Sequence, residues 1–301
     1  MKNGIVAIHK PEGISSARVV AQVKKALGVK KVGHTGTLDP FATGLLLCGI
    51  NQGTRISRFF LEGHKRYITR IRLGVETDTY DLTGKPVFTA PLEAMQALRE
   101  KDVEAVIKSF VGLQDQVAPA YSALKHEGQP LYKLARQGKI IQKPARRIEI
   151  FDIRILEIAL PNVDIEVFCS AGTYIRSLGF DIGRQLGCGA HLSQLCRTQS
   201  SSFLLETAIS LDAFKALDKT AAEERILPLS GCLEFMPKMM ADPVVAQKVR
   251  FGQKLYREDF GCQSENQEPF IRVTDNNNVL LAIVEPGVGD EEYNYSCVFT
   301  T

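Results

Sequence analysis

The chain has 301 residues, too many for one average domain and too few for three, so two domains are expected. An apolar content of 45% excludes a disordered chain, and no apolar run approaches the roughly 20 residues that span a bilayer. The net charge of +3 is unevenly distributed, because residues 230–301 sum to −5 and residues 1–229 to +8. A polyanionic partner is therefore expected on the first two-thirds of the chain.

Cysteine usage and the N-terminal sequence point to the cytoplasm. The seven cysteines are scattered without a Cys-x-x-Cys pair, and the N-terminal run lacks the cleavage-site pattern of a signal peptide. Cys188, His191 and Cys196 lie close together, but their spacing fits no common zinc site and a fourth ligand is not evident. No glycine-rich nucleotide-binding loop is present either, so neither a metal nor a dissociable cofactor is expected.

The first predicted elements are a strand, a helix and a loop. Residues 5–9 form an apolar strand, and Ser15 or Ser16 caps a helix that ends at Gly28. Residues 32–44 follow with no helical or strand period and many Gly and Thr residues, which is typical of a site loop.

The rest of the chain alternates between strands and helices. Residues 65–73 alternate cleanly, which places Tyr67 on the same face as Ile71 and Leu73, directed inward. After residue 229 the short elements of a compact β domain begin. The other expected elements are a strand at 45–50, helices at 54–61, 92–110 and 174–186, a hairpin of 148–156 and 163–169, a C-terminal helix at 246–251, and C-terminal strands at 270–274, 279–284 and 296–299.

Residues 117–147 form a basic insertion. Seven Lys and Arg residues, among them Lys125, Lys133 and Arg136, face one acid, with Tyr and His residues interleaved. This pattern indicates a nucleic-acid contact, although a solvated surface excursion would have the same composition.

Asp39 lies in the Gly/Thr loop immediately before Pro40, which biases Asp39 towards extended geometry. Such a carboxylate could be a nucleophile, a general base or a metal ligand, or it could cap the turn at Pro40. The dipeptide alone leaves these alternatives open.

Residues 33–46, GHTGTLDPFATGLL, closely resemble the signature loop of the TruB-type family of pseudouridine synthases. Further segments resemble other motifs of that family in the family's order, which makes the match far more specific than one short motif. These segments are HKPEGISS at 9–16, KRYITRIRLGVETDTYD at 65–81, PAYSALK at 119–125, CSAGTYIRSL at 169–178, LGCGAHL at 186–192 and LCR at 195–197. The sequence departs from the family at Ser201-Ser202-Phe203, where a glycine usually precedes the aromatic residue.

The resemblance implies roles for individual residues. Asp39 matches the catalytic aspartate, and Arg176 matches the arginine that pairs with it and favours its charged form. Tyr67 matches a tyrosine that stacks on the target base, although a plain core tyrosine would show the same pattern. Tyr174 and Leu195 match pocket walls.

Residues that handle the RNA are implied in the same way. His34 could be a general base, but the resemblance favours a side chain that fills the stack left by the flipped nucleotide. Lys10, next to Pro11, is expected to support the site loop. The insertion, with Lys125, Lys133 and Arg136, is expected to grip the RNA.

The expected fold is α+β. A pseudouridine synthase catalytic domain at 1–232 has a central mixed, mostly antiparallel sheet with flanking helices, and a small PUA-like β-barrel follows at 238–301. The expected function is isomerisation of uridine 55 in the T loop of tRNA by a cofactor-free, monomeric enzyme that flips the base out and needs no obligate protein partner. The alternatives are a non-catalytic tRNA-binding or tRNA-folding protein, an RNA-guided synthase, and a hydrolase that uses Asp39 on another substrate.

Overall fold

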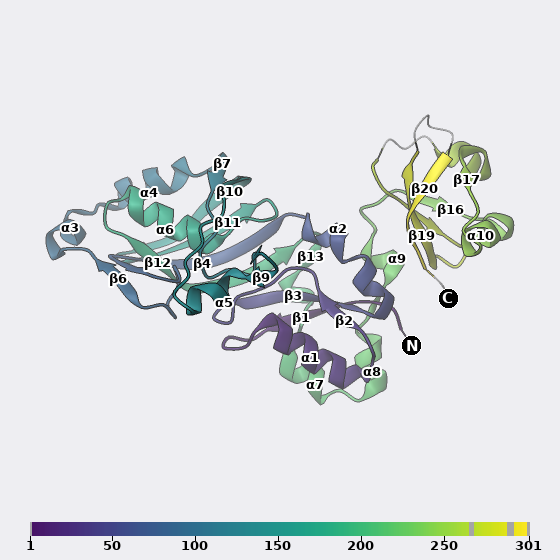
Figure 1. Ribbon diagram of the computed structural model, residues 1–301, viewed down its shortest axis with the longest axis horizontal. Coiled ribbons are helices and arrows are strands. Elements are labelled where there is room, and N and C mark those ends of the chain that lie inside the picture. The colour runs from purple at the N-terminus through teal and green to yellow at the C-terminus, as the bar shows by residue number, and fades with distance from the viewer. Residues whose placement is uncertain (1, 265–267, 288–291, 300–301) are drawn as a thin grey trace.

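The computed structural model of the protein describes residues 2–264, 268–287 and 292–299 and contains two principal β-sheets (Figure 1). The larger sheet belongs to the first 228 residues. Its strands are β1 (Gly4–Lys10), β2 (Val32–His34), β3 (Thr43–Ile50), β4 (Lys65–Leu73), β7 (Gly112–Gln116), β10 (Arg146–Ala159), β11 (Asn162–Cys169), β12 (Ala190–Ser200), β13 (Phe203–Leu204), β14 (Ile209–Ser210) and β15 (Leu227–Pro228).

The strand order of this sheet is β14-β1-β3-β12-β4-β11-β10-β7, with β2, β13 and β15 paired alongside it. Only the β1–β14 and β3–β12 pairs are parallel. The sheet is therefore mixed and mostly antiparallel, as expected from the sequence. Two small ladders accompany it, formed by β5 (Val75–Thr77) with β6 (Pro86–Thr89) and by β8 (Lys125–His126) with β9 (Gln129–Pro130).

Helices pack against both faces of the large sheet. Helix α1 starts where the Ser15 hydroxyl accepts a hydrogen bond from the N–H of Arg18 and ends at the left-handed Gly28, as its capping residues predict. The α-helices of this part are α1 (Ser16–Leu27), α2 (Ser57–Leu61), α3 (Leu92–Ala97), α4 (Glu100–Ser109), α5 (Leu131–Arg136), α6 (Ile175–Gln185), α7 (Leu211–Ala216), α8 (Lys219–Glu224) and α9 (Leu229–Cys232), with 3₁₀ turns at Asn51–Arg55 and Leu205–Thr207.

Strands β1 and β3 are buried on both faces, because the protein has apolar clusters on either side of them. Val6 and Ile8 pack into the main core with helices α1, α6 and α7, whereas Ile5 and Ala7 pack into a second cluster that includes Ile283 of the C-terminal part. The beginning of the chain is thus fixed between the two halves of the molecule.

Three of the expected elements differ locally in the structure. The single helix expected at 92–110 is two helices, α3 and α4, because Leu98 is extended and only α4 contributes buried residues to the core. The helix expected at 54–61 is interrupted at Ile56, between a 3₁₀ turn and α2. The loop expected at 32–44 begins with strand β2, which pairs with β3.

The C-terminal part is a smaller unit with its own apolar core, built around Met239, Val245 and Val273. Its five described strands curl into a half-barrel in the order β16-β18-β19-β20-β17. Figure 1 shows it set apart from the large sheet and joined to it beside α9. The elements are β16 (Lys238–Met240), α10 (Pro243–Arg250), β17 (Leu255–Tyr256), a 3₁₀ segment (Arg257–Ser264), β18 (Ile271–Thr274), β19 (Leu280–Pro286) and β20 (Glu292–Val298).

Candidate active site

Hydrogen bonds hold the loop on both sides of Asp39. The buried Ser16 hydroxyl, in the first turn of α1, accepts a hydrogen bond from the N–H of Leu38 at 2.8 Å and donates one to its carbonyl at 2.9 Å. The carbonyl of Pro40 accepts from the N–H of Gly13 at 2.8 Å and from Lys10 Nζ at 3.2 Å. Asp39 therefore sits between two anchored residues.

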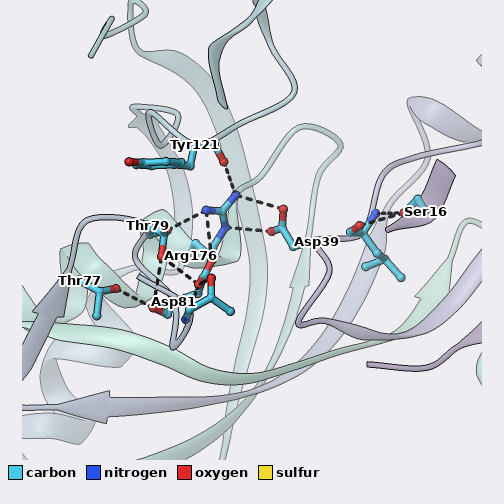
Figure 2. Close-up of polar contacts among 9 residues, drawn as sticks. Ser16, Asp39, Thr77, Thr79, Asp81, Tyr121 and Arg176 are labelled. Atoms are coloured by element: carbon cyan, nitrogen blue, oxygen red, sulfur yellow. Dashed lines mark hydrogen bonds and ion pairs between the residues drawn. The ribbon is translucent and has the colours of Figure 1, made fainter. Parts of the chain in front are cut away.

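Arg176 binds the Asp39 carboxylate in a two-pronged contact, with Nε 2.9 Å from Oδ2 and Nη2 3.2 Å from Oδ1 (Figure 2). The Arg176 side chain is 3% exposed and that of Asp39 is 33% exposed. The planar guanidinium fixes the direction of the carboxylate, while the carboxylate keeps access to the space in front of it.

The remaining donors of Arg176 are also used. Nη1 donates to the carbonyl of Thr79 at 2.7 Å, and Nη2 donates to the carbonyl of Tyr121 at 2.8 Å. Asp81 Oδ2 lies 3.4 Å from Nη1. As Figure 2 shows, the guanidinium joins three segments that are distant in sequence, so its orientation is strongly determined.

Asp81 is a buried carboxylate to which the sequence analysis gave no role. Its Oδ1 accepts from the hydroxyl and the N–H of Thr83 and from the hydroxyl of Thr79 at 2.5 to 2.9 Å. Its motif, residues 77–81, was visible in the sequence, but nothing in that motif pointed to Arg176. Asp81 is a second carboxylate beside Arg176, whose single guanidinium therefore lies between two acidic groups.

The electrostatic environment of Asp39 combines opposing effects. Burial raises the pKa of its carboxyl above the ordinary value, the Arg176 guanidinium acts against that rise, and Asp81 adds to it. Arg176 is therefore the group that most favours the ionised form, with a smaller contribution from Lys10, and a nucleophilic carboxylate requires that form.

Two cavities meet at Asp39 and Arg176, which line both. The first, of about 320 Å³, is also lined by Tyr67, Tyr174 and Leu195. The second, of about 510 Å³, is also lined by His34, Tyr121, Tyr132 and Arg136. The first cavity brings Asp39 together with the three residues expected to hold the target base.

Tyr67 on β4 points inward, as its strand face predicts. Burial raises the pKa of its phenol, against the effect of the neighbouring Arg197 guanidinium, so the hydroxyl stays protonated at neutral pH. Arg197 is itself buried and donates to the carbonyls of Leu45 at 2.8 Å and Gly36 at 3.2 Å. It forms a wall of the site that the sequence analysis did not assign.

The backbone at Gly44 accommodates Arg197 closely. Gly44 has a φ of +102°, and a Cβ there would lie 2.3 Å from the carbonyl oxygen of Arg197. Only glycine fits this position, which joins the catalytic loop to β12.

Lys10 and His34 lie on the N-terminal side of the site. Lys10 is fully buried and donates to the carbonyls of Pro11, Ile14 and Pro40 at 2.8 to 3.2 Å, and burial lowers its pKa to about 8. Its ammonium is thus directed at the loop. Burial and Arg197 lower the pKa of His34, so its ring is neutral at pH 7.

Of the basic side chains of the insertion, Arg146 lines the first cavity, whereas Lys125, Lys133 and Arg136 lie outside it. Lys125 on β8 and Lys133 on α5 are exposed and line neither cavity. Arg136, at the end of α5, lines the second cavity and lies over the Tyr132 ring at 5.7 Å. Of these three expected RNA-gripping residues, Arg136 is the one that lines a cavity together with Asp39.

Two further findings concern the described residues alone. No group of three or more His, Cys, Asp or Glu side chains there has an arrangement that could hold a metal ion. Among the same residues, no helix combines the length and the apolar character needed to cross a membrane.

Comparison with known proteins agrees with this geometry. The model "TruB family pseudouridylate synthase (N terminal domain)" matches residues 24–175, and the model "tRNA pseudouridylate synthase B C-terminal domain" matches residues 176–234. Tyr67 and Asp39 lie in the first match, and Arg176 opens the second.

Curated relatives carry the same enzyme name, and a solved structure has a similar fold. The tRNA pseudouridine synthase B of Thermotoga petrophila is 42% identical over 95% of this chain and 90% of that protein. That of Francisella tularensis subsp. novicida is 46% identical over 94% of this chain and 91% of that protein. A chain in a crystal structure of a Cbf5-Nop10-Gar1 complex is 26% identical, with a TM-score of 0.75 over 99% of this chain and 85% of the other. The chain therefore belongs to the TruB family of pseudouridylate synthases.

Proposed function

We propose that the protein converts uridine 55 in the T loop of tRNA into pseudouridine. The names of its relatives support tRNA as the substrate and isomerisation as the reaction. The observation that carries the proposal is the Asp39 carboxylate, aligned by Arg176 and opening into a cavity walled by Tyr67 and Leu195. Such a cavity holds one flipped nucleotide with its sugar at the carboxylate.

The chemistry of the reaction is assigned to three residues of the site. The reaction breaks the N-glycosidic bond, turns the uracil and joins carbon 5 to the sugar. Asp39 supplies the carboxylate that adds to the sugar or the base, or that starts elimination to a glycal. Tyr67 stacks on the base, and its protonated hydroxyl is placed to exchange a proton. Arg176 keeps Asp39 ionised and aligned.

The surrounding residues bind and position the RNA. We assign Tyr174 and Leu195 to the walls of the base site and His34 to the gap that the flipped nucleotide leaves in its stack. Lys10 is assigned to positioning the loop, because its ammonium contacts Pro40 and not the cavity. Lys125, Lys133 and Arg136 are assigned to the RNA backbone on the rim.

We also propose a stand-alone, monomeric enzyme with domains at 1–232 and 238–301, acting in the cytoplasm where tRNA is found. The basic insertion supports independence, since a protein without a guide has to grip the tRNA itself. The second candidate is an RNA-guided synthase, favoured by the likeness to the chain in the Cbf5-Nop10-Gar1 complex.

The test is incubation of the purified protein with an unmodified tRNA transcript and no other protein or RNA, followed by chemical mapping of pseudouridine. Modification at position 55 alone supports the proposal. An inactive protein that gains activity with a guide RNA supports the second candidate. Tight tRNA binding without modification under any condition would support a non-catalytic tRNA-binding protein.

A further inference from the structure

Arg146 is a cation on the wall of the first cavity, and no residue that the structure describes accepts a hydrogen bond from its side chain. It begins β10, opposite Gln116 of β7 in the strand register. Its guanidinium lies over the Tyr174 ring, 4.4 Å from the ring centre, and its buried Nε has no hydrogen-bond partner among residues 2–264, 268–287 and 292–299. Within the described part of the chain, Arg146 forms no ion pair with a carboxylate.

The other cations that line this cavity are all engaged. Arg176 binds Asp39, and Arg197 donates to two backbone carbonyls. Lys65 Nζ donates to the carbonyls at 60, 61 and 63, at 2.5 to 3.2 Å. Arg146 is therefore the cation of the cavity wall whose donors remain available to a ligand.

The protein fixes Arg146 and leaves room for it. The Gln116 side chain accepts from the N–H of Tyr174 at 2.7 Å and donates to the Tyr174 carbonyl at 3.0 Å. Gln116, which pairs with Arg146 in the sheet, therefore fixes the backbone of Tyr174, whose ring lies under the Arg146 guanidinium. At Gly172, φ is +84° and an added Cβ would lie 3.3 Å from Arg146 Cζ. The hydroxyl-bearing residues Ser170 and Thr173 line the same cavity.

We propose that Arg146 binds a backbone phosphate adjacent to the target uridine, with Tyr174 supporting the guanidinium from behind. The proposal rests on the proposed function, which places the base at Tyr67 and the sugar at Asp39. The phosphates on either side of that nucleotide then lie at the cavity wall. A guanidinium with free donors matches a phosphate, which accepts two of its hydrogen bonds at once.

The test removes the charge from each partner separately. The substrate is an unmodified T-arm stem-loop RNA, made with a neutral methylphosphonate at the phosphate on either the 5′ or the 3′ side of the target uridine. Single-turnover rates are measured for the wild type and for Arg146→Gln. The matched control is Arg147→Gln, which removes the same charge at the next residue. Arg147 is exposed, and its Nη1 lies 3.7 Å from Asp115 Oδ1.

With the wild type, one of the two methylphosphonates is expected to slow the reaction by about 10- to 100-fold, the usual effect of losing a charge-assisted hydrogen bond. Arg146→Gln is expected to be slowed to a similar extent on the natural RNA and to be insensitive to that methylphosphonate. Arg147→Gln is expected to keep the wild-type sensitivity. Arg146→Lys, which keeps the charge but loses the planar guanidinium, is expected to keep part of the wild-type sensitivity to the methylphosphonate.

Two results would overturn the inference while the proposed function stands. One is a wild type that modifies the natural RNA and is indifferent to both methylphosphonates. The other is an Arg146→Gln variant as sensitive as the wild type, which would leave Arg146 only a support for Tyr174. If Arg146→Gln does not fold, Arg146→Lys provides the test, because it is expected to lose part of the wild-type sensitivity, and sensitivity equal to that of the wild type would overturn the inference. A wild type inactive on the natural RNA would instead overturn the proposed function, and this inference with it.

Discussion

Arg176→Lys is expected to lower the single-turnover rate of pseudouridine formation by about 100-fold. The guanidinium contacts Asp39 at 2.9 and 3.2 Å and also donates to the carbonyls of Thr79 and Tyr121. A lysine ammonium, a single nitrogen on a shorter and more flexible side chain, cannot make all of these contacts together. Loss of one charge-assisted hydrogen bond to the carboxylate is worth about 1.5–3 kcal/mol, or roughly 10- to 150-fold in rate.

The assay is tritium release from tRNA labelled at carbon 5 of uridine, with enzyme in excess, because that hydrogen leaves when carbon 5 joins the sugar. Rates are measured over a range of pH. In Arg176→Gln the opposing charge is absent, so the pKa of Asp39 rises further above its ordinary value. Since Asp39 acts in its ionised form, the acidic limb of the rate profile is expected to move to higher pH.

The matched control is Arg184→Lys, further along the same helix α6. Arg184 binds the buried Glu76 through two contacts at 2.6 and 2.9 Å and lines neither active-site cavity. This variant is expected to lose stability and keep its rate. If Arg176→Lys retained its rate within about threefold, Arg176 would be a structural ion pair and the alignment of Asp39 would need another explanation.

Three further predictions concern the loop, the backbone and the RNA grip. Ser16→Ala leaves both backbone polar groups of Leu38 without their partner, so we expect the free energy of unfolding to fall by about 2 kcal/mol and the reaction to be slower. The control Ser15→Ala removes only the exposed cap of α1 and is expected to lose about 1 kcal/mol at an unchanged rate. Equal rates for the two variants would contradict this prediction. Ser201 has a φ of +53°, a left-handed conformation that strains a residue other than glycine. Ser201→Gly is therefore expected to raise the free energy of unfolding in urea by about 1 kcal/mol, and a free energy below that of the wild type would contradict this strain. Removing four positive charges from the insertion is expected to reduce the slope of log tRNA affinity against log salt concentration by roughly two or more. Removing four positive charges from the C-terminal half-barrel is expected to change that slope little, since two of its lysines already pair with Asp259 and Glu292. The four insertion residues are Lys125, Lys133, Arg136 and Lys139.

The elements with local signals were predictable from the sequence. Ser15 and Gly28 mark the ends of α1 because capping depends on residues next to the helix. The alternation in 65–73 placed Tyr67 inward because a strand exposes every second residue to the same side. Both predictions are confirmed by the structure.

The break between α3 and α4 had no such signal. Leu98 is neither glycine nor proline, and the apolar spacing continues across it. The chain turns there because Val103 and Ile107 of α4 enter the main core while α3 remains on the surface. Only the packing of the complete sheet determines that turn.

The site itself depends on contacts between distant segments. Arg176 lies 137 residues from Asp39, and only the family resemblance implied that they pair. No local pattern linked Asp81 to Arg176 or Arg197 to Tyr67. Arg146 was one of seven basic residues in a segment, and its missing acceptor became visible only with its neighbours in place.

The most direct test of the central claim is pseudouridine formation by Asp39→Asn, measured beside tRNA binding. The amide keeps the shape of the side chain and removes the carboxylate that Arg176 aligns. We predict no pseudouridine at position 55 after a time in which the wild type modifies all of its tRNA, with affinity for tRNA within about threefold of the wild type. Modification at a rate near that of the wild type would contradict the assignment of Asp39 as the catalytic carboxylate.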